Sequence, residues 1–145
     1  METWIIMVST NVFLIAVFIA VGVWLSKSPP PRRPRRSLIA NGYAQTKMAT
    51  VNDDTWDFAN RDYGRRTMRI GFGAIPVVVV TMVPVVWRSE EVVAYVGAGL
   101  TVVLIAAFLL AMVWTERALR ATFTADGTRR DRHVEHPGRS QTARS

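Results

Sequence analysis

Three long apolar runs interrupt the chain, and the charged residues lie between and after them. The runs cover residues 4–25, 70–87 and 92–114, and none of them contains Asp, Glu, Lys or Arg. A soluble helical domain would instead mix apolar and charged positions along each helix. At 1.5 Å per residue the runs reach about 27 to 35 Å, which matches a hydrocarbon core of roughly 30 Å. The pattern predicts an all-α membrane protein with three transmembrane helices.

The same pattern divides the chain into seven segments. In chain order we expect a first transmembrane helix (1–25), a basic Pro/Arg-rich loop (26–51), an interfacial helix (52–69), a second transmembrane helix kinked by proline (70–87), an outer loop (88–91), a third transmembrane helix (92–115) and a basic, largely disordered tail (116–145). The first run is longer than the apolar part of a signal peptide and lacks a basic segment before it, so we interpret it as a retained span. Trp4 and Trp24 bracket this run about 30 Å apart, which predicts one indole near each headgroup layer.

The distribution of basic residues predicts the orientation in the membrane. The 145 residues include 18 Lys or Arg and 11 Asp or Glu, which gives a formal net charge of +7. Ten of the bases lie between the first and second runs, one lies between the second and third, and seven follow the third. By the positive-inside rule, the N-terminus faces out and the long loop and the C-terminus face the cytoplasm. We expect a multi-pass protein of the plasma membrane. A nucleic-acid-binding domain is excluded, because it would leave three apolar runs unexplained.

Residues 52–69 have the pattern of a helix that leads into the second apolar run. Asn52 or Asp53 can cap it, acidic residues fill its first turns, and arginines close it, which suits the helix dipole. One face carries Trp56, Ala59, Tyr63, Thr67 and Ile70. An interfacial helix lying on the inner leaflet fits this pattern. We expect Trp56 and Tyr63 to be membrane-interface anchors rather than residues that stack on a ligand.

The apolar runs contain little chemistry for catalysis. Away from the run ends, where Tyr95 lies, their polar side chains at depth, apart from the tryptophan N–H groups, are Ser9, Thr10, Asn11, Thr81 and Thr101. No acid, base or His is available at that depth to activate Ser9, which argues against an enzyme or a proton-coupled transporter. Asn11 is expected to form a hydrogen bond with a neighbouring helix, with a substrate contact as the alternative. Small residues at Ala16 and Ala20, and at Gly97 and Thr101, would allow close helix contact or dimerisation.

No metal, cofactor or catalytic residue is predicted. The chain has no cysteine, which excludes disulfides and thiolate ligands. His133 and His136 are spaced to share a helical face, but Pro137 and Gly138 follow at once. Without a third ligand, this pair favours a solvated tail over a metal site.

Prolines raise two further alternatives. Pro76 and Pro84 predict kinks in the second span, which either pack against neighbouring helices or line a path for a ligand or ion. The segment 29–36 contains four prolines and four arginines and is expected to be extended. It serves either as a topology anchor beside anionic lipid headgroups or as a dedicated site for a phosphoinositide or a protein partner.

The loop sequence from Asn41 to Arg61 resembles the hallmark of the sporulation-delaying-protein immunity (SdpI-like) family of small bacterial membrane proteins. The matching positions are Asn41, Thr46, Lys47, Trp56, Ala59, Asn60, Arg61 and Gly64. Tyr43 and Gln45 depart from the family's Gly-x-Arg element, in which Gly and Arg occupy these positions. The resemblance covers about residues 36–115. It implies a non-enzymatic protein that confers immunity to a membrane-active peptide toxin, or one that holds a cytoplasmic regulator at the membrane.

Six residues are the candidates for an interaction site: Asn41, Thr46, Lys47, Trp56, Asn60 and Arg61. Asn41 and Thr46 would satisfy backbone groups of the loop, Trp56 would anchor the helix, and Arg61 would bind a lipid phosphate or a partner's carboxylate. The alternative function is an accessory or oligomeric subunit of a transporter or other membrane complex, in which the chain forms a homo-oligomer or joins a larger partner. That alternative predicts a polar cavity near Asn11 and Thr81.

Overall fold

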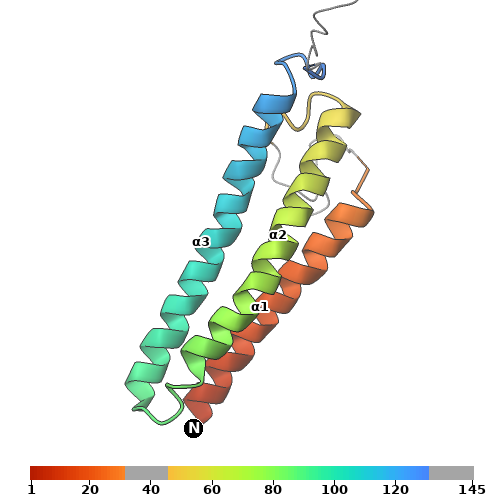
Figure 1. The fold of residues 1–145 in the computed structure, drawn as a ribbon. Coiled ribbons are helices and arrows are strands. Elements are labelled where there is room, and N and C mark those ends of the chain that lie inside the picture. Colours follow the sequence, from red (N-terminus) through yellow and green to blue (C-terminus); the bar gives the residue numbers. More distant parts are fainter. Residues whose placement is uncertain (32–45, 131–145) are drawn as a thin grey trace, which may run out of the picture.

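The computed structural model describes residues 1–31 and 46–130, which form an elongated bundle of three helices (Figure 1). The helices are α1 (Glu2–Lys27), α2 (Asp53–Met82) and α3 (Glu90–Thr122), and each runs antiparallel to the one before it. The N-terminus lies beside the α2–α3 turn at one end of the bundle. The opposite end holds loop 46–52 and residues 123–130, and α2 and α3 extend beyond α1 there. The prediction of an all-helical chain is confirmed.

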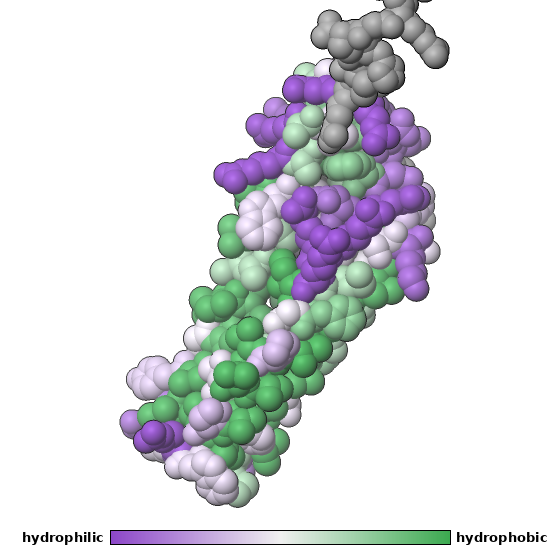
Figure 2. Space-filling view, in the orientation of Figure 1, coloured by the Kyte–Doolittle hydropathy of each residue, from purple (hydrophilic) through white to green (hydrophobic). Residues whose placement is uncertain are grey.

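Two of the described helices, α1 and α3, are long and apolar enough to cross a membrane. Their exposed side chains are also apolar: Phe13 is 70% exposed, Val102 is 65% exposed and Leu109 is 55% exposed. Figure 2 shows this apolar surface over the part of the bundle near the N-terminus, whereas hydrophilic side chains gather at the opposite end. An apolar surface of this extent is typical of a protein that contacts lipid.

The helix α2 differs from the sequence prediction, because it is one continuous helix where an interfacial helix at 52–69 and a second span at 70–87 were expected. Its N-terminal half does not offer its apolar face to lipid: Ala59 is 0% exposed and Tyr63 is 3% exposed, in a cluster with residues of α1 and α3. The helix ends at Met82, since Pro84 lacks the N–H that would continue the hydrogen-bond ladder. Its apolar part, 70–82, reaches only about 20 Å. A separate interfacial helix and a third span of full length are therefore not confirmed.

Facing glycines bring α1 and α2 into backbone contact. A Cβ atom on Gly22 would lie 2.8 Å from the Gly64 carbonyl oxygen, and one on Gly64 would lie 2.7 Å from the Gly22 carbonyl oxygen. At the α1–α3 contact, a Cβ atom on Gly97 would lie 2.7 Å from Met7 Cβ. Small residues of this kind let helices in membranes approach closely. The other predicted small pair, at positions 16 and 20, is exposed and takes no part in these contacts.

Hydrogen bonds inside the apolar half hold the other two helices to α1. Asn11 is 0% exposed, and its Nδ2 donates to the carbonyl oxygens of Met7 (2.9 Å) and Gly97 (3.4 Å). Thr101 Oγ1 donates to Asn11 Oδ1 at 3.2 Å. The predicted interhelical role of Asn11 is confirmed. At the end of the bundle that holds the N-terminus, Trp4 Nε1 donates to the Met82 carbonyl oxygen at 2.9 Å, which ties α1 to the last turn of α2.

Substituting Gly22→Ala or Gly64→Ala should destabilise the bundle by about 1 to 3 kcal/mol, because the new methyl group would meet backbone atoms that cannot move aside. The matched controls are Gly73→Ala and Gly99→Ala, since a Cβ atom at either position meets nothing within 4 Å. These controls should be neutral or up to about 1 kcal/mol more stable, as expected for Gly→Ala in a helix. Helix content would be followed during unfolding in mixed micelles of increasing denaturing-detergent fraction. If the two variants and the two controls unfolded at the same denaturing-detergent fraction, the close contact between Gly22 and Gly64 would be contradicted.

Candidate binding site at the basic end of the bundle

The segment before α2 is held by local hydrogen bonds. Asn52 caps the helix, because its Oδ1 accepts the Thr55 N–H at 2.8 Å while Thr55 Oγ1 accepts the Asn52 N–H at 3.2 Å. This reciprocal pair is a capping box. Thr46 Oγ1 accepts the Ala49 N–H at 3.2 Å, the type of loop contact that its sequence position predicts. These bonds give loop 46–52 a defined path over the end of the bundle.

Trp56 is buried inside this end of the bundle and does not lie at the membrane surface as expected. Its side chain is 2% exposed, and its Nε1 donates to the Pro30 carbonyl oxygen at 2.7 Å. Asn60, one turn later and also buried, donates from Nδ2 to the Trp56 carbonyl oxygen at 2.9 Å. Trp56 thereby joins α2 to the segment that follows α1, whereas the Asn60 bond lies within α2. Because the Trp56 face packs inward, the arginines of α2 face outward.

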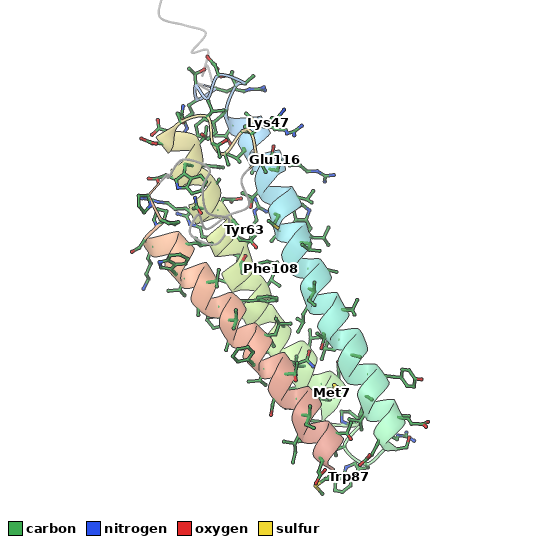
Figure 3. All side chains as sticks on the ribbon, turned by 180° about the vertical axis from the view of Figure 1, so that it is seen from behind. Met7, Lys47, Tyr63, Trp87, Phe108 and Glu116 are labelled. Atoms are coloured by element: carbon green, nitrogen blue, oxygen red, sulfur yellow. The ribbon has the colours of Figure 1, made fainter. Side chains whose placement is uncertain are left out.

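Other tryptophans occupy the surface positions typical of a membrane interface. Trp24 on α1 is 50% exposed and Trp114 on α3 is 45% exposed, both toward the basic end. Each of these helices also has an aromatic residue near its opposite end. On α1, Trp4 lies about 30 Å along the helix from Trp24, and on α3 the exposed Tyr95 lies about 28 Å from Trp114. Figure 3 also places Trp87 at the end opposite Lys47 and Glu116. Aromatic residues at such a separation are typical of the two headgroup layers.

Three exposed arginines on α2, at positions 61, 65 and 69, form an arginine stripe along one face of the helix. Arg61 pairs with Asp57 at 3.8 Å, whereas in the described part of the chain Arg65 and Arg69 have no carboxylate within 4.0 Å. Gly64 lies against Gly22, three residues before the end of the first apolar run. The last two arginines of the stripe are therefore at the same level along the bundle as apolar residues of α1, although they face outward. In Figure 2, hydrophilic side chains extend from the basic end onto the apolar part of the surface.

Residues 123–130 form an ordered turn, where a disordered tail was expected. The Arg130 N–H donates to the Thr122 carbonyl oxygen at 2.8 Å, and Gly127 adopts a φ of 82° that favours glycine. Hydrogen bonds from two hydroxyl groups lower the pKa of the Asp126 carboxyl group below its ordinary value. The bond from Thr124 has the largest effect, and the bond from Thr128 adds to it.

Contacts with α2 hold this turn in place. Asn52 Nδ2 donates to the Gly127 carbonyl oxygen at 2.8 Å, and the buried Phe123 ring meets Phe58 edge-on at 5.4 Å. The prediction of a disordered tail is therefore wrong for residues 116–130, because α3 continues to Thr122 and the turn follows it. Its remaining part, which contains His133 and His136, lies outside the described residues.

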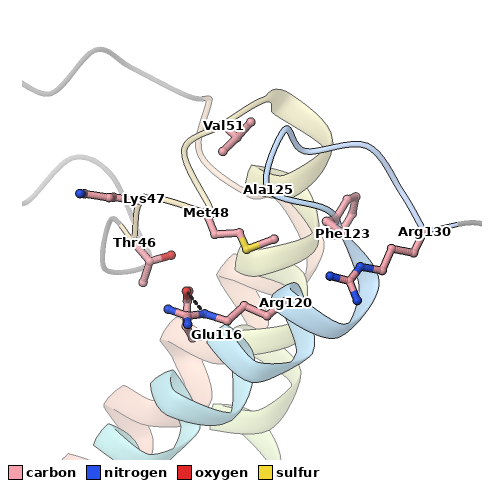
Figure 4. Close-up of a pocket in the computed structure, with 9 residues that line it drawn as sticks. All are labelled: Thr46, Lys47, Met48, Val51, Glu116, Arg120, Phe123, Ala125 and Arg130. Atoms are coloured by element: carbon pink, nitrogen blue, oxygen red, sulfur yellow. Dashed lines mark hydrogen bonds and ion pairs between the residues drawn. The ribbon is translucent and has the colours of Figure 1, made fainter.

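A pocket of about 660 Å³ opens between loop 46–52, the end of α3 and the turn (Figure 4). Its lining comprises Thr46, Lys47, Met48, Val51, Glu116, Arg120, Phe123, Ala125 and Arg130. Glu116 Oε1 accepts from Arg120 Nε at 3.1 Å. Glu116 Oε2 is buried and has no hydrogen-bond partner among the residues that the structure describes. The pocket thus combines three basic side chains, one carboxyl group and an apolar wall.

The candidate residues from the sequence separate into two groups. Thr46, Trp56 and Asn60 make the internal hydrogen bonds that shape the basic end, whereas Lys47 and Arg61 are exposed. Lys47 lines the pocket, and Arg61 begins the arginine stripe. Asn41 lies outside the described residues, as do Tyr43, Gln45 and the arginines of the Pro/Arg-rich segment.

Sequence reasoning missed the pocket residues that follow the third apolar run, namely Glu116, Arg120, Phe123, Ala125 and Arg130. The spacing of Glu116 and Arg120 and the Asp-Gly pair at 126–127 are signals for a helix pair and a turn, respectively. The structure describes no group of three or more His, Cys, Asp or Glu side chains that could hold a metal ion within residues 1–31 and 46–130.

Comparison with protein-family models, curated proteins and solved structures finds no match to this chain.

Substituting Trp56→Phe should lower the free energy of unfolding by about 1 to 3 kcal/mol, because the buried Pro30 carbonyl oxygen would lose its donor. Trp24→Phe is the matched control, since that indole is half exposed. Thermal unfolding in detergent would compare the two variants with the parent protein. If both substitutions lowered the melting temperature equally, the hydrogen bond from Trp56 would not stabilise the basic end.

Proposed function

We propose that this chain is a non-enzymatic integral protein of the bacterial plasma membrane, with its N-terminus outside and its basic end in the cytoplasm. The apolar surfaces of α1 and α3 and their exposed aromatic residues support the membrane location. The excess of Lys and Arg in segments 26–69 and 115–145 supports the orientation. In this arrangement α2 completes the bundle, with its apolar half in the hydrocarbon and its charged half toward the cytoplasm.

The arginine stripe supports a contact with anionic lipid headgroups. An arginine facing the bilayer centre costs about 2.5 to 3.5 kcal/mol, so an exposed guanidinium must reach the headgroup layer or a partner. Arg65 lies beside Gly64, and Arg69 lies only about 6 Å farther along the helix. From that depth a long side chain can extend its charge toward lipid phosphates while its methylene groups stay in an apolar environment. The stripe would thus hold the charged half of α2 at the inner leaflet.

We further propose that the basic end confers immunity to a membrane-active peptide toxin, or binds a cytoplasmic regulator, as in the SdpI-like proteins that the loop resembles. One observation carries this proposal. The buried motif residues Trp56 and Asn60 stabilise the same end of the bundle from which Lys47 and Arg61 project. Such an arrangement holds cations in place for a partner without supplying a nucleophile and its base.

The alternative function, an accessory or oligomeric membrane subunit, has less support. Its argument depended on a polar cavity near Asn11 and Thr81. The Asn11 amide instead forms hydrogen bonds with Gly97 and Thr101 within the same chain. The group that could have faced a substrate or a partner helix is therefore used to join α1 to α3.

A reporter fused after Ser145 tests the orientation. Green fluorescent protein at this position should fluoresce, and alkaline phosphatase at the same position should be inactive, because the C-terminus is expected in the cytoplasm. The matched pair of fusions after Arg88, in the expected outer loop, should give the opposite result. Active phosphatase after Ser145 would overturn the proposed orientation.

Loss of the gene tests the immunity proposal. A deletion strain should become sensitive to a membrane-active peptide made by the same organism or a neighbour, and the parent gene should restore survival. The double variant Lys47→Ala, Arg61→Ala should fail to restore it at an equal protein level. Arg117→Ala removes an exposed cation outside the motif and should restore survival fully. Unchanged survival of the deletion strain across a panel of such peptides would refute the proposal.

A further inference from the structure

The pocket at the basic end has an excess of positive charge. Arg120 is paired with Glu116 at 3.1 Å, while Lys47 and Arg130 are exposed and have no carboxylate within 4.0 Å in the described part of the chain. Two unpaired cations from segments more than 80 residues apart therefore line one cavity. Arginine and lysine gathered in this way are suited to a phosphate group, which accepts several charge-assisted hydrogen bonds at once.

The Glu116 carboxyl group in the same pocket has one oxygen that no hydrogen-bond donor reaches among the described residues. Glu116 Oε2 is buried without a partner, although its neighbour Oε1 is held by Arg120. A buried oxygen that lacks a donor costs free energy, and binding a donor from a ligand would recover it. Figure 4 shows Glu116 and Arg120 side by side beneath Thr46. A ligand that fits both features carries an N–H or O–H donor a few bonds away from its phosphate.

The remaining wall of the pocket is apolar. Met48, Val51 and Phe123 contribute it, and Phe123 is itself held against Phe58. A volume of about 660 Å³ lies within the range of small-molecule sites and greatly exceeds the size of a phosphate ion. The cavity therefore has room for an apolar or glycerol-like portion beside a charged head. This combination distinguishes it from a plain anion site on a helix end.

We propose that this pocket binds a phosphate ester bearing a primary ammonium group, the chemistry of phosphoethanolamine. The basic side chains of Lys47, Arg120 and Arg130 around the pocket attract the phosphate, the partly exposed Glu116 carboxyl group accepts from the ammonium group, and the apolar wall packs against the rest of the ligand. The source is either the headgroup of a membrane lipid or a water-soluble ester. The lipid source rests on the proposed membrane location, since Trp114 at the interface would place Glu116, two residues later, at headgroup depth.

Lipid retention tests the membrane source. The full-length protein in detergent would be exposed to equal amounts of phosphatidylethanolamine and phosphatidylcholine, and the lipid retained would be measured by native mass spectrometry. Phosphatidylcholine is the matched probe, because its trimethylammonium group has no N–H to donate. We expect about tenfold preference for phosphatidylethanolamine, which corresponds to 1.4 kcal/mol. A second arm measures binding of soluble phosphoethanolamine and phosphocholine by ligand-observed NMR.

Matched variants assign the binding to the pocket. Arg130→Ala should weaken binding of both phosphate esters about tenfold, whereas Arg129→Ala removes the adjacent exposed cation that does not line the pocket and should change neither. Glu116→Gln should reduce the preference for the ammonium compound over its trimethylated analogue while leaving phosphate binding in place. Thermal unfolding of each variant would confirm that the bundle remains folded.

The outcomes separate the two sources and the proposal from its rivals. If the protein prefers phosphoethanolamine over phosphocholine but shows no lipid preference, the pocket binds a water-soluble ester. That result supports the proposal even if the membrane location is wrong. Preference in the lipid arm supports a lipid ligand. Equal retention of the ammonium and trimethylammonium forms in both arms, or equal effects of Arg129→Ala and Arg130→Ala, would overturn the proposal.

Discussion

The contact between Gly22 and Gly64 sets the arrangement of the whole bundle. Because neither residue has a side chain, the backbones of α1 and α2 meet, and a Cβ atom on either would lie under 3.0 Å from the other's carbonyl oxygen. Trp4 repeats the connection at the opposite end of α1 through the Met82 carbonyl oxygen. These two contacts align α1 with α2 from Gly64 to Met82. The first turns of α2 then extend past the end of α1 and help to build a separate polar end.

This alignment explains why the amphipathic face of α2 turns inward. The periodicity of Trp56, Ala59, Tyr63 and Thr67 shows that one face must be buried, but periodicity does not say whether lipid or protein covers it. Once Gly64 lies against α1, residues on the same face as Gly64 must also point into the bundle. Trp56 then meets Pro30, and Tyr63 meets Phe108 edge-on at 5.5 Å. The arginine stripe is a consequence of the same rotation, because it occupies the opposite side of the helix.

The sequence was sufficient for the presence of apolar helices and for the cap before α2, since these depend on local chemistry. It did not predict that 53–82 form one helix or that α3 continues to Thr122. The apolar runs predicted α1 and α3, Asn52 was one of two candidate caps, and Asn11 was expected to bond a neighbouring helix. The turn at 123–130 and the pocket could not be predicted in this way. They depend on contacts such as Asn52 with Gly127 and Phe58 with Phe123, each joining residues more than 60 positions apart. Composition alone made this stretch look like a solvated tail.

The two ends of the bundle differ in where their polar side chains find partners. In the apolar half, every polar side chain that joins helices finds its partner within the chain, as Asn11 does with Gly97 and Thr101. At the basic end, the hydrogen bonds of Thr46, Trp56 and Asn60 are also internal, but Lys47 and Arg130 project from the structure that those bonds create. Cations held on a packed framework lose less side-chain entropy when an anion binds than cations on a flexible tail. Because exposed cations project from an internally hydrogen-bonded framework, this end is suited to binding an anion.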